Sequence, residues 1–362
     1  MSMLFCGRNS LTQLAGFLIS AAFVLLAPPL PGQVPSESES RQVSGQQLPD
    51  DVFQEPRPKQ IAKPSYPEHE NLQRIEGWVS LGFMVDPQGK PFEVTVLRST
   101  GNKTFENLAV KAIEQSTFEP GSLNGQPIES SYELKFQFTN ENITAPGATP
   151  GFIHRYESLQ RAIKANNQAT AEASLKELKI ANLYEDAYFG IATYSYASKW
   201  GDDSQQLEGL RRAIAGEDRA RYLPKELFSE VLRACLDLEL KMHFYAEALT
   251  TWKRLQKSGI DPATAAQYKP VIAQLQTLRS DNSGYDVYGV LEDGSWKVHL
   301  FKRRFRTLIS TGYISQAKLR CEKRFALFPI EPKVDYQVPR DYGSCLIEFE
   351  GAPGTRFVLA QF

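Results

Sequence analysis

The stretch Gly77-Trp-Val-Ser-Leu-Gly-Phe-Met-Val85, with Asp86-Pro-Gln-Gly89 and Phe92-Glu-Val-Thr-Val-Leu97 after it, decides the fold of the first folded region. Its first part alternates large apolar residues with small or polar ones, which is typical of a strand with one buried face. The proline and glycine of the middle part favour a tight turn. The stretch therefore predicts a β-hairpin.

The next residues extend this hairpin into a small mixed domain. Residues 104–115 carry apolar side chains at helical spacing. Asn124-Gly125 favours a turn, and Ser131-Tyr-Glu-Leu-Lys-Phe-Gln-Phe138 alternates as a third strand. We therefore expect the order β-β-α-β within a domain of residues 61–142.

Two further regions follow, with different periodicities. Residues 150–280 show helical periods joined by short polar breaks, and one helix pair around residues 230–255 is similar to a tetratricopeptide unit. Residues 284–362 return to alternating, strand-like segments, predicted at 285–291, 296–301, 345–350 and 355–362. The predicted fold class is α+β, with a small β-β-α-β domain, a helical-hairpin array and a small β domain with one disulfide.

The N-terminal region has the features of an export signal. Arg8 precedes an apolar run, Leu14–Ala27, that is shorter than the ~20 residues of a typical membrane-spanning helix. We interpret residues 1–33 as a signal peptide or a membrane anchor. Residues 34–60 are rich in Pro, Ser and Gln and are predicted to be a disordered linker. The rest of the chain is then expected in the periplasm, either soluble or anchored to the inner membrane.

Composition argues against several classes of function. The formal net charge of −1 favours neither nucleic acid nor an anionic membrane. The four histidines lack metal-ligand spacing, and the sequence has no P-loop, GxGxxG or GxSxG motif. We expect no catalytic residue, no metal, no cofactor and no enzymatic activity.

The cysteines predict one disulfide. Cys321 and Cys345 lie close together in the β-rich region, and export permits their oxidation, so we pair them. Cys235 lies in an apolar helical pattern and is interpreted as a buried free thiol. Cys6 belongs to the targeting segment.

An ordered set of short motifs identifies a family resemblance for residues 61–142. The set comprises Tyr66-Pro67, Gly77-x-Val79, Phe83-x-Val85-Asp86-x-x-Gly89, Val94-x-Val96-x-x-Ser99-x-Gly101, Ala109-x-x-Ala112, Phe118-x-Pro120, Gly125-x-Pro127 and Phe136-x-Phe138. In motif and in order this segment resembles the C-terminal domain of the TonB energy transducers. The resemblance covers about a fifth of the chain and is followed by a tetratricopeptide-like region.

The resemblance implies a peptide-binding edge. In that family an extended peptide of an outer-membrane receptor is added to the exposed sheet edge, which here is the third strand, with Tyr132, Leu134, Phe136 and Phe138. Tyr66 and Pro67 either contribute to a peptide groove or only fix the path of the chain into the domain. The aromatic strand residues either line the ligand edge or belong to the core.

Two hypotheses for function follow. The first is a periplasmic, TonB-like protein that binds an extended peptide of an envelope protein or outer-membrane receptor. If the chain is anchored, inner-membrane motor proteins are expected as further partners, in energy-coupled transport across the outer membrane. The alternative is a periplasmic scaffold that binds proteins through its helices and transduces no energy. A basic cluster, Lys302–Arg306 with Arg320, Lys323 and Arg324, either meets an acidic partner or is a solvated face.

Overall fold

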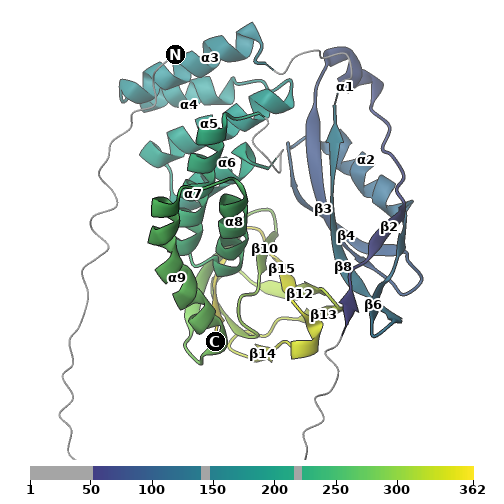
Figure 1. The fold of residues 1–362 in the computed structure, drawn as a ribbon. Helices are drawn as coiled ribbons and strands as arrows, with labels where there is room; N and C mark the ends of the chain where they lie inside the picture. Colours follow the sequence, from purple (N-terminus) through teal and green to yellow (C-terminus); the bar gives the residue numbers. More distant parts are fainter. Residues whose placement is uncertain (1–51, 140–146, 216–221) are drawn as a thin grey trace, which may run out of the picture. The chain divides into compact units, whose positions relative to one another are not determined.

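A computed structural model describes residues 52–139, 147–215 and 222–362 (Figure 1). The predicted signal or anchor, residues 1–33, and most of the predicted linker lie outside the described residues. Among the described helices, none combines the length and the hydropathy needed to span a membrane.

The first domain has the predicted β-β-α-β order. A short helix, α1 (Glu68–Gln73), precedes β3 (Gly77–Val85), β4 (Pro91–Ser99), α2 (Lys103–Glu114) and β8 (Ser130–Phe138). The strands form an antiparallel sheet in the order β4-β3-β8, with β3 in the centre (Figure 1). The first hypothesis requires β8 to lie at an edge of the sheet, and it does.

Local chemistry explains the turn and the helix start of this domain. The Asp86 carboxylate accepts hydrogen bonds from the backbone N–H groups of Gln88 and Lys90. A side chain at Gly89, which has φ +82°, would meet the Phe118 carbonyl oxygen at 2.1 Å, so only glycine fits there. Asn102 caps α2 by accepting from the N–H groups of its first turn. Apolar side chains of β3 and α2 then form one buried core.

Part of the predicted linker is ordered, contrary to expectation. Residues 53–60 contain β1 (Phe53–Gln54) and β2 (Arg57–Gln60), which pair with β6 (Gly121–Leu123) and β5 (Thr117–Glu119). Strand β7 (Gln126–Ile128) completes a β1-β6-β7 sheet. The prediction of disorder was wrong for these residues. The two short strands gain backbone hydrogen bonds but bury little side-chain surface, so the sequence carries no apolar pattern that marks them.

The middle region is a helical array, as predicted. Its helices are α3 (Pro150–Lys164), α4 (Gln168–Lys176), α5 (Leu183–Trp200), α6 (Asp203–Ala213), α7 (Lys225–Lys241), α8 (Tyr245–Lys257) and α9 (Pro262–Ser280). Helices α5 and α6 approach closely at Gly190. A Cβ atom added there would lie only 2.4 Å from the backbone nitrogen of Ala213. Glycine at this crossing lets the two backbones touch.

The C-terminal region is a sandwich of two four-stranded sheets, with more strands than predicted. The strands are β9 (Tyr285–Leu291), β10 (Ser295–His299), β11 (Arg304–Thr311), β12 (Ile314–Cys321), β13 (Arg324–Pro329), β14 (Asp335–Gln337), β15 (Cys345–Gly351) and β16 (Thr355–Gln361), with a 3₁₀ turn at Arg340–Tyr342. The sheet orders are β10-β15-β12-β13 and β14-β11-β16-β9, and one apolar core draws residues from both. We missed β11–β14 because charged residues interrupt their apolar alternation.

The basic cluster is largely committed to internal contacts. Lys302 is 4% exposed, and its ammonium group donates to the carboxylate and carbonyl of Asp281. Arg320 is also 4% exposed and pairs with Glu348 at 2.7 Å. The interpretation as a solvated face is therefore wrong for these two residues, since their charges are neutralised inside the fold.

Candidate functional site

The outward edge of β8 can be located from the hydrogen bonds of β3. The Trp78 carbonyl accepts from the N–H of Thr100, and the N–H of Asp86 donates to the Lys90 carbonyl, so both residues direct their backbone groups toward β4. Backbone direction alternates along a strand. The odd-numbered residues of β3, from Val79 to Val85, therefore direct their backbone groups toward β8.

The register then separates the two kinds of position on β8. Val79, Leu81 and Phe83 lie opposite Phe136, Leu134 and Tyr132. The backbone groups of these even-numbered residues are therefore used within the sheet. The alternate residues Ser131, Glu133, Lys135 and Gln137 direct their backbone groups away from β3. Among the described strands, β8 pairs with β3 alone.

The four predicted edge residues lie mainly in the core beside α2. Phe136 and Phe138 are 9% and 3% exposed, and the Phe138 ring stacks on Phe105 at 4.3 Å. Leu134 and Tyr132 are half-buried, and the Tyr132 ring lies 5.9 Å from that of Phe83. An added strand would pair with the backbone of the alternate residues, such as Ser131 and Glu133, and not with these four. The role of the four side chains in binding a peptide stays a prediction.

Two hollows open beside the first residues of β8. The larger, of about 490 Å³, is lined by Tyr132 and by residues 53–57. The smaller, of about 260 Å³, is lined by Phe53, Glu55, Glu322 and residues 131–133. Of the predicted edge residues, Tyr132 is the one that lines these two hollows. Sequence reasoning did not find Phe53 or Glu55, since both lie in the segment that was predicted to be a linker.

Tyr66 and Pro67 stand where the chain leads into the domain. The Tyr66 hydroxyl donates a hydrogen bond to the Ile75 carbonyl, and its ring stacks on Phe105 at 6.0 Å. Burial, together with the charges of Glu76 and Glu70, raises the pKa of Tyr66 to about 12. Pro67 is the residue that precedes α1. These contacts are those expected of a pair that fixes the path of the chain, while a contribution to a peptide groove remains a prediction.

The sheet face opposite α2 is in contact with the other two regions of the chain. Trp78 is 2% exposed, and its indole N–H donates to the Asp186 carboxylate of α5 at 2.9 Å. Arg212 of α6 donates to the same carboxylate at 2.8 Å. Burial raises the pKa of Asp186, and these two donors oppose that rise. The partner of Trp78 is 108 residues away along the chain, so no signal for this contact was readable in the sequence.

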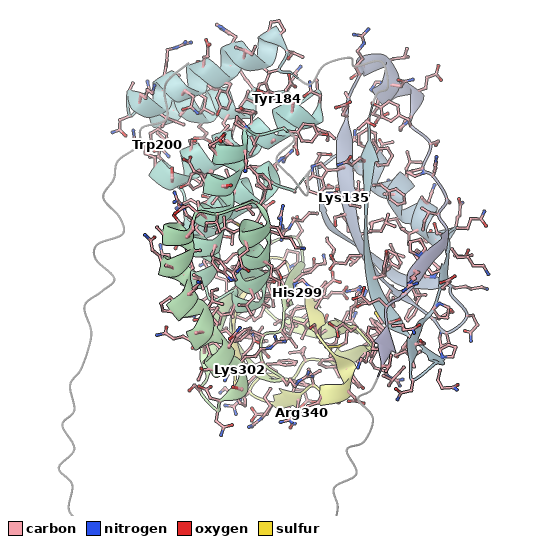
Figure 2. The ribbon with its side chains drawn as sticks, in the orientation of Figure 1. Lys135, Tyr184, Trp200, His299, Lys302 and Arg340 are labelled. Carbon is pink, nitrogen blue, oxygen red and sulfur yellow. A yellow bond between two sulfur atoms is a disulfide. The ribbon has the colours of Figure 1, made fainter. Side chains whose placement is uncertain are left out.

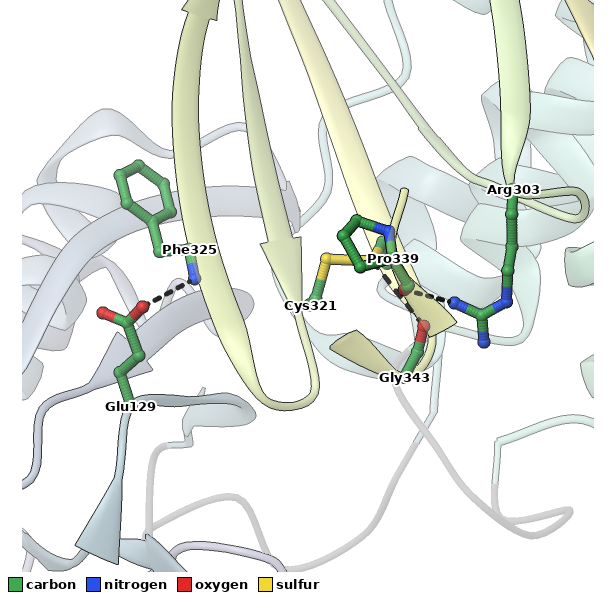
Figure 3. Close-up of a disulfide and its surroundings, with 7 residues drawn as sticks. Glu129, Arg303, Cys321, Phe325, Pro339 and Gly343 are labelled. Atoms are coloured by element: carbon green, nitrogen blue, oxygen red, sulfur yellow. Dashed lines mark hydrogen bonds between the residues drawn. A yellow bond between two sulfur atoms is a disulfide. The ribbon is translucent and has the colours of Figure 1, made fainter. Parts of the chain in front are cut away.

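The C-terminal sandwich contacts the same sheet through charged and aromatic groups. Arg320 lies 3.5 Å from the Glu93 carboxylate, and Phe92 meets Phe325 edge to face at 5.8 Å. The Phe325 N–H donates to the Glu129 carboxylate at 3.2 Å (Figure 3). The first domain is thus held on this face by residues from β12 and β13.

His299 joins three regions of the chain (Figure 2). Its ring lies 3.1 Å from the Glu247 carboxylate of α8 and 4.0 Å from that of Glu133 on β8. Burial alone lowers the pKa of His299, and so does Arg98, but the hydrogen bond and charge of Glu247 outweigh both, with a contribution from Glu133. The net pKa shift is upward.

We expect this contact to be stronger in acid than in base. Because the pKa of His299 is raised on folding, its stabilisation is fully present below the ordinary pKa and is lost as pH rises through the folded-state pKa. The side chain is 43% exposed, so the effect is about 1 kcal/mol or less. Urea unfolding of the wild type and of His299→Gln should differ more at pH 5.5 than at pH 8.5. An equal difference at both pH values would show that His299 acts through its shape alone.

The predicted disulfide between Cys321 and Cys345 is present (Figure 3). It joins neighbouring strands, β12 and β15, at residues that are directly opposite in register. Cys235 is a buried free thiol, and burial raises its pKa. Within the described ranges, no group of three or more His, Cys, Asp or Glu residues is placed to hold a metal ion.

Comparison with known proteins gives consistent matches to one part of the chain. Residues 62–139 match the family model described as the Gram-negative bacterial TonB protein C-terminal. Protein TonB of Haemophilus ducreyi is 39% identical over 75 residues, which cover 21% of this chain and 26% of that protein. Protein TonB of Vibrio cholerae is 30% identical over 79 residues, covering 22% and 32% respectively.

Solved structures of the same kind are also similar. The TonB C-terminal domain of Pseudomonas aeruginosa has 26% identity and a TM-score of 0.22, and it covers 24% of this chain and 89% of that chain. The TonB2 protein of Vibrio anguillarum has 20% identity and a TM-score of 0.21, covering 33% and 100%. The chain spans between about a quarter and a third of the length of the curated relatives above. On the match of the family model, residues 62–139 are a TonB-type C-terminal domain, and a helical array and a β-sandwich follow it in the chain.

Proposed function

We propose that this chain is an envelope protein whose TonB-type domain binds an extended peptide of an outer-membrane or other envelope partner. The peptide is added as a strand to β8. The observation that carries the proposal is the edge position of β8 in a domain of this family, with the backbone groups of Ser131 and Glu133 directed away from β3. The proposal assigns binding and no catalytic step.

The proposed location is the periplasm, and the proposed context is energy-coupled transport across the outer membrane. Two features support this assignment: the apolar run Leu14–Ala27, which has the composition of an export signal, and the family match of residues 62–139. Coupling to inner-membrane motor proteins is part of the proposal only where residues 1–33 remain as an anchor.

A proline at position 133 should block strand addition. Proline removes the outward N–H of Glu133 and places its ring where the added strand would lie, while the pairing of β8 with β3 uses the neighbouring residues. We expect at least tenfold weaker capture, corresponding to about 1.4 kcal/mol. The measurement is the yield of envelope proteins crosslinked by a photoreactive residue at position 131 in the full-length exported chain.

Glu133→Ala is the matched control for this experiment. It removes the same carboxylate, and with it the contact to His299, but keeps the backbone donor. Strand addition predicts nearly normal crosslinking with alanine and loss with proline. If both variants crosslink as the wild type does, then β8 does not receive the partner.

A second candidate function is a scaffold that binds partners through its helices. One observation favours it: the TonB-type domain buries Trp78 against the helical core, and Arg212 of α6 donates to the Thr100 carbonyl. A domain that is fixed in this way serves equally well as a packing module. Unchanged partner capture by Glu133→Pro, together with loss of capture after substitutions on exposed helix faces, would favour the scaffold.

A further inference from the structure

The segment from Phe53 to Arg57 runs beside the start of β8 without pairing with it. Its own pairing is used elsewhere, because β1 pairs with β6 and β2 pairs with β5. Phe53, Glu55 and Tyr132 line both hollows at this end of the edge. A strand added at Ser131–Glu133 would therefore lie between β8 on one side and residues 53–57 on the other.

This segment is held at both of its ends. Val52 and Asn124 exchange hydrogen bonds of 2.9 Å, and the Lys323 ammonium lies 5.2 Å from the centre of the Phe53 ring. At the other end of the segment, Arg57 lies opposite Glu119 in the β2–β5 pair. A wall that is fixed at both ends can contact a ligand without first paying the entropy of being ordered.

The size of the hollows fits a short piece of strand. An extended residue in a sheet occupies roughly 160 Å³, from the rise per residue, the strand spacing and the sheet spacing. The smaller hollow, of about 260 Å³, therefore has room for roughly one to two residues, and the larger, of about 490 Å³, for roughly three. Their shared lining includes two aromatic rings, Phe53 and Tyr132, both half-buried. Paired aromatic rings favour a large apolar side chain between them.

We propose that residues 53–57 form the second wall of the peptide site, with a large apolar side chain of the added peptide held between Phe53 and Tyr132. This inference rests on the proposed strand addition. The second wall would make strand addition selective for the sequence of the peptide. Backbone pairing with β8 accepts most sequences, whereas the Phe53 wall favours peptides that carry such a residue at one position.

The experiment uses a display library of random decapeptides, panned against the full-length exported chain. We expect the enriched peptides to share a large apolar residue at one position. Phe53→Ala should bind a selected peptide about tenfold more weakly, since the side chain loses its apolar contact. Lys59→Ala is the control and should bind normally, because Lys59 is exposed on β2, just beyond the wall, and lines neither hollow.

A double-mutant cycle separates contact from a general effect on folding. Replacing the shared apolar residue of the peptide by alanine should weaken binding to the wild type about tenfold and binding to Phe53→Ala hardly at all. An equal loss of binding affinity with the wild type and with Phe53→Ala would contradict the proposed contact between Phe53 and the peptide. If Phe53→Ala binds as the wild type does while Glu133→Pro loses binding, the wall is wrong and strand addition stands. If no peptide is enriched, or Glu133→Pro binds normally, both proposals fail.

Discussion

Trp78→Ala is expected to lower the free energy of unfolding by about 3–5 kcal/mol, the usual cost of truncating a buried tryptophan. Trp78 is 2% exposed and belongs to the apolar cluster of the helical array, although it lies on a strand of the TonB-type domain. Its loss also removes the indole donor of Asp186, which is 2% exposed. Urea unfolding followed by far-ultraviolet circular dichroism measures the change.

Two variants test whether the cost arises at this contact. Trp78→Phe keeps most of the apolar volume and loses the indole donor, so we expect a smaller loss of about 1–2 kcal/mol. Asp186 would still be paired with Arg212. Trp200→Ala is the matched tryptophan truncation at a half-buried position, and it should cost less than Trp78→Ala. Equal costs for Trp78→Ala and Trp200→Ala would contradict a special role for the contact between β3 and α5.

Removal of the disulfide is the second large effect that we expect. The double variant Cys321→Ala/Cys345→Ala should lower the free energy of unfolding by about 3 kcal/mol. The bridge closes a loop with a sequence separation of 24, and its absence gives the unfolded chain more freedom. Urea unfolding of the oxidised wild type and of the double variant, under the same conditions, gives the difference.

The control for the disulfide is a cysteine that closes no loop. Cys235→Ala removes a buried thiol from α7, and we expect a loss smaller than that of the double variant. A double variant that unfolds at the same urea concentration as the wild type would contradict the expected stabilisation by the bridge. The pairing of Cys321 with Cys345 would then contribute little to the free energy of unfolding.

The candidate site was predictable only in part. The edge strand followed from the order β-β-α-β, and the alternation of residues 131–138 identified the strand itself. The predicted edge side chains, those of Tyr132, Leu134, Phe136 and Phe138, pack toward α2, because apolar residues mark the core face of a strand. The residues that offer backbone groups outward are the polar ones between them, and periodicity gives these no separate signal.

The amino-acid sequence alone determined the features that depend on neighbouring residues. Strand alternation in Gly77–Val85, the turn at Gly89, the helical periods of residues 150–280 and the proximity of Cys321 to Cys345 were all readable in this way. Each follows from the period of a single element or from the conformational range of one residue.

The tertiary structure alone decided which distant residues meet. Trp78 meets Asp186, Phe53 and Tyr132 line the same hollows, and Arg320 contacts Glu93 across 227 residues of sequence. Strands β1, β2 and β11–β14 likewise form from segments without a clear apolar period. These features depend on packing between elements, where burial and paired charges offset the cost of ordering segments that carry only a weak local preference.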